Sequence, residues 1–301
     1  MSALAERLAG LRAQAGVVSA GATPRGVAGL SAAPCLEAPA SGLAPAIASS
    51  SPFPEQLRRL LGIRLRATPA PAFVDRALPG IEIATGVRLV ETFYDWQETP
   101  ARINAQFAGF GSITRDSLLY FDTETTGLSG GTGTRAFMIG ASDWNQGGLR
   151  VRQLLLTTMA GEHAMLETFA AWLSPDTVLV SYNGRSYDAP LLATRYRLAR
   201  QANPLAGLRH LDLLHPVRRR FRGVWENCRL ATVERNWLDL QREDDLPGSD
   251  APRAWRDYLR GLGAGDLRRV LGHNDQDLRS LAALLQRLAG TEALTLQSDR
   301  P

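Results

Sequence analysis

Short apolar runs bounded by turn residues recur in the second half of the chain and are typical of buried strands. The runs lie at 118–121, 136–143, 149–156 and 177–182. The stretch Asn145-Gln-Gly-Gly, between the second and third runs, is a hairpin signal. Because the first three runs are joined by short turns, they predict an antiparallel meander.

After the third strand, apolar residues recur at helical spacing in several segments. These segments predict helices over 161–173, 189–199, 251–260 and 267–288. Three antiparallel strands followed by alternating helices and strands imply a mixed sheet with helices on its faces. The predicted fold class is therefore α/β, with a ribonuclease H-like mixed sheet flanked by helices.

Changes in composition divide the chain into four predicted parts. Residues 1–51 are rich in Ala, Gly, Ser and Pro and are predicted to be disordered. Residues 52–115 are predicted to be an extension that packs on the main domain without chemistry of its own. Residues 116–290 are predicted to form the ribonuclease H-like domain, and residues 291–301 a flexible tail.

Composition narrows the possible functions. The net charge of +4 is compatible with a polyanionic partner, and all 34 basic residues are arginine. The glycine-rich stretch 127–133 therefore cannot be a Walker A loop, and Schiff-base lysine chemistry is excluded. The two cysteines form no Cys-x-x-Cys pair, which predicts a reducing, cytoplasmic compartment. No apolar run has membrane-spanning length, and no signal-peptide core is recognisable, so no membrane partner is expected.

The first predicted strand ends in two acids, Asp122 and Glu124. Residues i and i+2 of an extended chain point to the same face, so both carboxylates project from one side of the strand end. Buried charges need a partner, and hard cations such as Mg²⁺ take carboxylate oxygens. For a lone Asp-x-Glu, the alternative is a strand that simply ends in a polar turn. The prediction of a metal site therefore depends on further acidic residues downstream.

Two more acids occur where the topology brings them toward the same edge. The fourth strand breaks at Asn183-Gly184, and Asp188 stands at the start of a helix, where helix capping alone is the alternative. In open α/β sheets, active sites lie at the carboxyl ends of the strands. Asp277 follows His273 by four residues, so both lie on one face of the last helix. The alternative there is an exposed His–Asp pair.

Two other segments are candidates for the site. One contains residues that either join the acids or have turn and core roles: His210, Asp212 and His215. The other is the basic segment with Arg218 and Arg219, close to Trp225. Arginines interleaved with aromatic rings suit a single-strand channel through phosphate neutralisation and base stacking. A solvated helix face is the competing interpretation.

Four converging carboxylates would repel one another and raise each other's pKa values unless metal neutralised them. Two divalent ions, Mg²⁺ or Mn²⁺, about 3.5–4 Å apart would do so, and such a pair suits phosphodiester hydrolysis. His273 is a natural candidate for the base that activates the attacking water.

The motifs resemble those of a known superfamily. Asp122-Thr-Glu-Thr-Thr-Gly is similar to the first exonuclease motif of the DEDD, or DnaQ-like, superfamily, Asn183-Gly-Arg-Ser-Tyr-Asp188 to the second, and His273-Asn-Asp-Gln-Asp277 to the third. More closely, the chain resembles the YprB-like ribonuclease H-like proteins over residues 83–288. That resemblance is carried by Gly130-Gly-Thr-Gly-Thr, Tyr182-Asn-Gly, His210-Leu-Asp-Leu-Leu-His-Pro and Gly272-His-Asn.

The resemblance implies a metal-dependent nuclease, a 3′–5′ exonuclease acting on single-stranded DNA or RNA by a two-metal mechanism. It assigns the metal ligands Asp122, Glu124, Asp188 and Asp277, the base His273, and contacts with the terminal nucleotide from Thr125 and Asn183. The basic segment supplies Arg218 and Arg219 as further predicted substrate contacts. One departure concerns the base: in the histidine subgroup it lies five residues before the last Asp, whereas here the separation is four.

Two alternatives remain from other classes of function. The first is a non-catalytic nucleic-acid-binding module that keeps the fold, although clustered negative charge facing phosphates gives a pure binder no advantage. The second is a structure-specific endonuclease, since ribonuclease H-like folds perform both kinds of cleavage.

Overall fold

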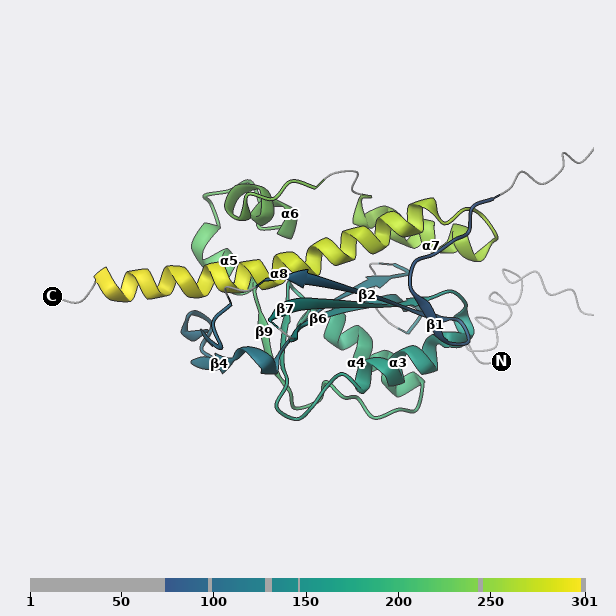
Figure 1. Cartoon of the computed structure of the whole chain (residues 1–301), viewed down its shortest axis with the longest axis horizontal. Helices are drawn as coiled ribbons and strands as arrows, with labels where there is room; N and C mark the ends of the chain where they lie inside the picture. The colour runs from purple at the N-terminus through teal and green to yellow at the C-terminus, as the bar shows by residue number, and fades with distance from the viewer. Residues whose placement is uncertain (1–73, 97–98, 128–131, 146, 243–245, 299–301) are drawn as a thin grey trace, which may run out of the picture. The chain divides into compact units, whose positions relative to one another are not determined.

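The structure is a computed structural model that describes residues 74–96, 99–127, 132–145, 147–242 and 246–298. The predicted disordered region 1–51 and the first part of the predicted extension, 52–73, lie outside the described residues. The centre of the fold is a seven-stranded sheet in the order β1-β2-β7-β6-β5-β8-β9 (Figure 1).

The middle of this sheet contains the predicted meander. β5 (Leu118–Thr125), β6 (Ala136–Asn145) and β7 (Gly148–Leu156) pair antiparallel in succession. β8 (Val178–Ser181) then pairs parallel with β5, and β9 (Arg209–Asp212) pairs parallel with β8. The prediction of an α/β fold with a mixed, ribonuclease H-like sheet is confirmed.

Residues ahead of the meander complete one edge of the sheet. β2 (Val87–Asp95) pairs antiparallel with β7 along its whole length, and β1 (Ile81–Ala84) pairs with β2. β3 (Arg102–Asn104) and β4 (Ser112–Thr114) form a separate two-stranded sheet. Two strands of the predicted extension therefore belong to the main sheet.

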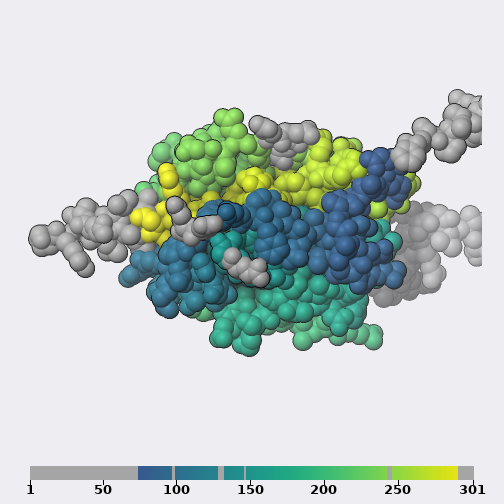
Figure 2. Space-filling model, in the orientation of Figure 1, coloured from purple at the N-terminus to yellow at the C-terminus, as the bar shows by residue number. Residues whose placement is uncertain are grey.

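Helices cover both faces of the sheet (Figure 1). α8 (Gly265–Ser298) crosses one face and packs against β5, β6 and β7, whereas α3 (Glu162–Ala170) and α4 (Asp188–Leu198) lie on the other side. α8 continues past Leu288, where the apolar pattern predicted its end. Figure 2 shows α8 as a yellow band between the segments that precede β5 and the green segments α5 to α6.

The remaining helices are short. They are α5 (Leu214–Phe221), α6 (Leu230–Val233), the π-helical turn η4 (Glu234–Leu238), α7 (Ala251–Leu259), and the 3₁₀ turns η1 (Gln106–Ala108), η2 (Arg115–Ser117), η3 (Met159–Gly161) and η5 (Gly248–Asp250). Within the described part of the chain, none of the helices combines the length and the apolar character needed to cross a membrane.

The side chains of β5 alternate between two apolar clusters. Leu119 and Phe121 are buried in a cluster that includes Phe169 of α3, whereas Leu118 and Tyr120 are buried with several leucines of α8. Since this alternation continues to the strand end, Asp122 and Glu124 lie on the side of α8, and Thr123 between them lies on the other side. The strand thus presents acids to one face and a hydroxyl to the other.

Candidate active site

Asp122 is held by the last helix. Its Oδ2 accepts a hydrogen bond of 2.9 Å from Nδ2 of Asn274 on α8. The Asn274 Oδ1 accepts in turn a 2.9 Å hydrogen bond from Nε2 of Gln153 on β7, which also donates to the Leu271 carbonyl at 2.8 Å. Asn274 is completely buried and Gln153 nearly so. This network connects the end of β5 to α8 and β7 and fixes the orientation of the Asp122 carboxylate.

A glycine on β6 makes room for this network. A Cβ at Gly140 would lie 2.0 Å from Asn274 Oδ1, far inside van der Waals contact. Gly140 and Gln153 were not among the predicted site residues, and Asn274 was named only as part of the motifs Gly272-His-Asn and His273-Asn-Asp-Gln-Asp277. Asn274 stands three residues before Asp277, a spacing that places both on one helix face and is the signal that points to it.

Asp188 reaches the site from α4. It is the first residue of that helix, and no side-chain hydrogen bond caps the helix from the preceding Tyr187. The Asp188 Oδ1 instead accepts a hydrogen bond from Oγ1 of Thr123, on the far side of β5 from Asp122. Because the Asp188 carboxylate is engaged by β5, helix capping alone does not account for it. A Cβ at Gly184 would lie 2.6 Å from Ser181 Oγ and 3.1 Å from Asp188 Oδ2, so this glycine lets the loop close on Asp188.

Asp277 is paired with Arg242, which was not among the predicted site residues. Arg242 donates a hydrogen bond to Asp277 Oδ1 and holds Glu234 of η4 with two more, at 2.6 and 2.8 Å. Glu234 is 1% exposed and also accepts a 2.5 Å hydrogen bond from Ser280 Oγ of α8. One guanidinium thus neutralises two buried carboxylates on different elements.

His273 lies beside this pair. Its Nε2 is 3.5 Å from Asp277 Oδ2, and its Nδ1 is 3.0 Å from the Arg242 guanidinium. Arginine is always a donor, so the contact requires Nδ1 to accept and leaves the ring proton on Nε2, toward Asp277.

The four predicted ligands form one electrostatic cluster. Burial raises the pKa of Asp122 well above its usual range, and the charges of Asp277, Asp188 and Glu124 raise it further. Burial raises the pKa of Asp188 to about 6, although the Thr123 hydrogen bond opposes this shift. Burial also raises the pKa of Asp277, against the lowering effects of Arg242 and His273. The fold therefore concentrates negative charge where desolvation makes it costly.

The chemistry of these donors fits a hard divalent cation, since all four are carboxylates. In the described ranges, no group of three or more His, Cys, Asp or Glu side chains is arranged as a ready-made metal site. The side chains are turned to protein partners instead: Asp122 to Asn274, Asp188 to Thr123 and Asp277 to Arg242. Metal binding would require Asp277 to share or exchange its arginine.

The other predicted residues have different surroundings. Asp212 is buried and accepts hydrogen bonds from the backbone N–H groups of Asn183, Arg185 and Leu214, at 2.7, 3.1 and 3.1 Å. It therefore has the turn role that was its alternative. Asn183 has a φ of 68°, in the left-handed region. The Thr125 Oγ1 donates a 3.0 Å hydrogen bond to the Gly127 carbonyl.

The predicted substrate arginines lie on α5. Arg219 donates a hydrogen bond to the Phe107 carbonyl, and Arg218 and Arg219 line a groove of about 480 Å³ together with His215 and Arg222. His215 therefore belongs to this groove, which is lined by residues of the basic segment.

Replacing Gly140 with alanine should break the Asn274 network. The new methyl group would displace the Asn274 amide from Asp122 and leave the buried Gln153 donor without its partner. We expect the free energy of unfolding to fall by about 2–4 kcal/mol, the combined scale of overpacking and a lost buried hydrogen bond. Urea unfolding measures it. Gly272→Ala is the matched control, because a Cβ there meets open space and alanine favours a helix; equal losses in both variants would contradict the prediction.

His210 should make stability depend on pH. Its Nε2 lies 2.7 Å from Ser181 Oγ, and burial lowers its pKa to about 4. An unfolded histidine titrates near about 6.5, so between these values the unfolded chain binds a proton that the native protein does not. Stability is then complete above about pH 6.5 and falls as the pH drops toward 4. Over this window, the free energy of unfolding of His210→Gln should fall by about 1–3 kcal/mol less than that of the wild type. Thermal unfolding at several pH values measures the difference, and identical pH profiles would contradict the assignment.

The sheet order and the acid cluster at the ends of β5 and β8 define a ribonuclease H-like protein with a nuclease-type fold. The sequence model of the RNase_H superfamily matches residues 119–289, more than half of the chain, and the protein belongs to this superfamily. The resemblance to the YprB-like ribonuclease H-like family is confirmed. The chain is 36% identical over 171 residues to the protein titled "Uncharacterized protein YprB" from Bacillus subtilis (strain 168). This match covers 56% of the chain but only 41% of the relative.

Solved structures show weaker similarity. The family B DNA polymerase from the hyperthermophilic archaeon Pyrobaculum calidifontis matches with a TM-score of 0.42 and 17% identity, over 57% of this chain and 24% of that chain. A zinc-bound complex of E. coli ExoI with single-stranded DNA matches with a TM-score of 0.36 and 12% identity, over 58% of this chain and 40% of that chain.

Proposed function

We propose that this protein is a metal-dependent nuclease that hydrolyses phosphodiester bonds of nucleic acid. The observation that carries the proposal is the cluster of Asp122, Glu124, Asp188 and Asp277, in which burial and mutual repulsion raise the pKa of Asp122. A protein gains nothing from such a cluster in its resting fold, and cations relieve the repulsion. Membership of the RNase_H superfamily supports a nucleic acid as the substrate.

In this proposal the four acids bind the metal ions, and neighbouring side chains hold the acids in position. The ligands of two ions, Mg²⁺ or Mn²⁺, are Asp122, Glu124, Asp188 and Asp277. Bound divalent ions supply a nucleophilic water at neutral pH and neutralise charge on the phosphate. Asn274 and Thr123 orient two of the carboxylates, and Arg242 holds Asp277 near the others. Because these contacts now occupy the carboxylates, metal binding would exchange some of them for bonds to the ions.

We further propose His273 as the base that takes a proton from the attacking water. Its distance of 3.5 Å from Asp277 Oδ2 supports a position at the cluster. For this role its acceptor nitrogen must exchange the Arg242 contact for water, because Arg242 donates to Nδ1.

The substrate we propose is the 3′ end of single-stranded DNA or RNA, degraded in the 3′–5′ direction in the cytoplasm. Thr125 and Asn183 stand at the ends of β5 and β8 and would contact the terminal nucleotide. Arg218 and Arg219 would bind phosphates in the α5 groove. The division into a disordered region 1–51, an extension 52–115, a nuclease domain 116–290 and a flexible tail 291–301 stays a prediction, with β1 and β2 of the extension joined to the main sheet.

Degradation of 5′-labelled single-stranded DNA and RNA, with Mg²⁺ or Mn²⁺ and with EDTA, tests the function. We expect a ladder that shortens from the 3′ end, disappears with EDTA and shows which nucleic acid is preferred. A circular single strand should resist, and its cleavage would make the protein an endonuclease. Absence of cleavage together with metal-independent binding would instead establish a non-catalytic nucleic-acid-binding module.

A further inference from the structure

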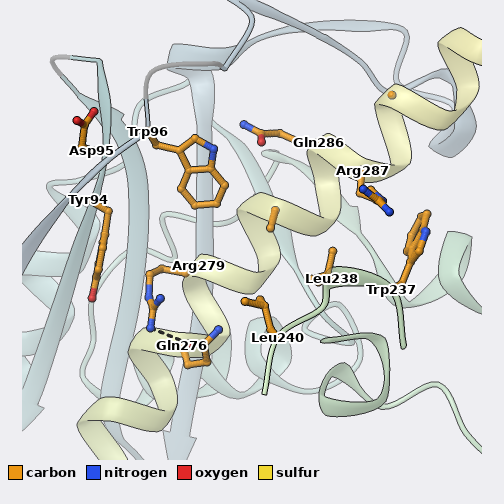
Figure 3. A pocket seen from close by; sticks show the side chains of 12 residues that line it. Tyr94, Asp95, Trp96, Trp237, Leu238, Leu240, Gln276, Arg279, Gln286 and Arg287 are labelled. Carbon is orange, nitrogen blue, oxygen red and sulfur yellow. Dashed lines mark hydrogen bonds between the residues drawn. The ribbon is translucent and has the colours of Figure 1, made fainter. Parts of the chain in front are cut away.

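A pocket of about 900 Å³ opens beside α8 (Figure 3), and its lining on this helix begins one residue before Asp277. Gln276, the neighbour of Asp277, lines its near end, and Gly290 lines its far end. The intervening lining residues of α8 recur three or four positions apart, so they form one face of the helix. At 1.5 Å per residue, this face extends about 21 Å from Gln276 to Gly290. The pocket is therefore elongated and leads away from Asp277.

Two tryptophans stand on opposite sides of this helix face (Figure 3). Trp96 follows β2 and packs edge-on against Trp144, with ring centroids 5.6 Å apart. Trp237 of η4 packs edge-on against Phe221, with centroids 4.9 Å apart. Both rings are half-buried, so each is held in place by an aromatic neighbour and still contributes to the pocket wall.

The polar lining of the pocket suits the edges and phosphates of nucleotides. Arg279 lies over the Tyr94 ring at 4.8 Å and donates hydrogen bonds to Asp275 at 2.9 Å and to Gln276 at 2.7 Å. Arg287, farther along α8, is exposed. The Gln276 amide is engaged by Arg279 and Ser280, whereas Gln286 donates to Thr99 Oγ1 at 2.6 Å and adds an amide oxygen that can accept. One acid, Asp95, lies at the rim.

We propose that this pocket binds bases of a single-stranded nucleic acid whose 3′ end lies at the acid cluster. Indole rings stack on any base, arginines neutralise phosphates, and amides contact base edges. A strand with one end at Asp277 passes along the α8 face because the pocket starts at Gln276. This inference rests on the proposed nuclease function for the placement of the strand end, and it adds the site that holds the nucleotides behind the end.

Binding of fluorescein-labelled dT12 and rU12 by the full-length protein tests the pocket, in an Asp122→Asn background with Mg²⁺ so that no strand is cut. Trp237→Leu should weaken binding about 5- to 150-fold, the range for loss of one stacked base, and Trp237→Phe should restore most of it. Arg287→Gln should reduce the slope of log Kd against log salt concentration by about one, the change expected for the loss of one phosphate contact. The control is Arg197→Gln, on α4 at the opposite face of the sheet from α8, and it should change neither the affinity nor its salt dependence.

Hydrolysis of the p-nitrophenyl ester of thymidine 5′-monophosphate separates this inference from the proposed function. This ester is too short to reach the tryptophans, so its hydrolysis by the wild type measures the proposed nuclease activity independently of the pocket. Unchanged dT12 and rU12 binding in Trp237→Leu would overturn the pocket, whatever the hydrolysis shows. Weaker binding without hydrolysis of any substrate by the wild type would support the pocket and overturn the nuclease.

Discussion

Asp122→Asn should lower the rate of phosphodiester hydrolysis by about 10³-fold or more, while the fold becomes at least as stable as the wild type in EDTA. The loss follows from the proposed metal site: an amide would replace one of its charged ligands, and stabilisation of transition-state charge by such an ion would amount to several kcal/mol. Stability is preserved because the Asn side chain can still accept from Asn274, and one buried charge no longer repels the other carboxylates. Rates on labelled oligonucleotides and thermal unfolding in EDTA measure the two effects.

The control for this substitution is Asp176→Asn, which makes the same change at an exposed acid before β8. It should alter neither rate nor stability. An Asp122→Asn variant that retains wild-type activity would remove the basis for the proposed metal site. A variant that is clearly less stable in EDTA would show instead that Asp122 makes favourable contacts that outweigh its repulsion.

Arg242→Met should be the most destabilising single substitution in the cluster. It leaves the carboxylates of Glu234 and Asp277 buried without their cation. Removal of one partner from a buried ion pair typically costs about 3–5 kcal/mol, because an uncompensated charge remains. Urea unfolding should show this loss, and adding Glu234→Gln to Arg242→Met should recover part of it by removing one of the stranded charges.

A nearby ion pair provides the comparison. Arg235 of η4 contacts Glu226, and both side chains are more than half exposed. Exposed pairs contribute at most about 1 kcal/mol, so Arg235→Met should have a small effect. Equal losses at Arg235 and Arg242 would show that burial of the Arg242 pair is not what makes it important.

The parts of the fold that depend on local periodicity could be predicted from the sequence. Strands β5 to β8 follow from short apolar runs, and the acids at the end of β5 share a face because side chains alternate along a strand. Asp188 and Asp277 were predicted for the site because topology brings strand ends and the last helix together. The three-residue strands β3 and β4 are too short for a period to be recognised.

The partners of the acids could not be predicted in the same way. Arg242 follows a π-helical turn, and its contact with Asp277 spans 35 positions in sequence. In the sequence, therefore, nothing distinguishes it from an arginine on the surface. Gln153 looks like one more polar position along β7, and only the packing of α8 on the sheet gives it Asn274 as a partner. Gly140 likewise has meaning only once Asn274 lies against it.

The long reach of the Asn274 hydrogen bond has a consequence for biosynthesis. Asn274 and Asp122 are 152 residues apart, so the carboxylate cluster is complete only after α8 has docked on the sheet. Synthesis proceeds from the N-terminus, and β5 to β9 emerge from the ribosome before α8 does. A nascent chain or a fragment truncated before α8 therefore has no assembled site. Under the proposed nuclease function, such a chain would therefore be inactive until α8 has been synthesised and has docked.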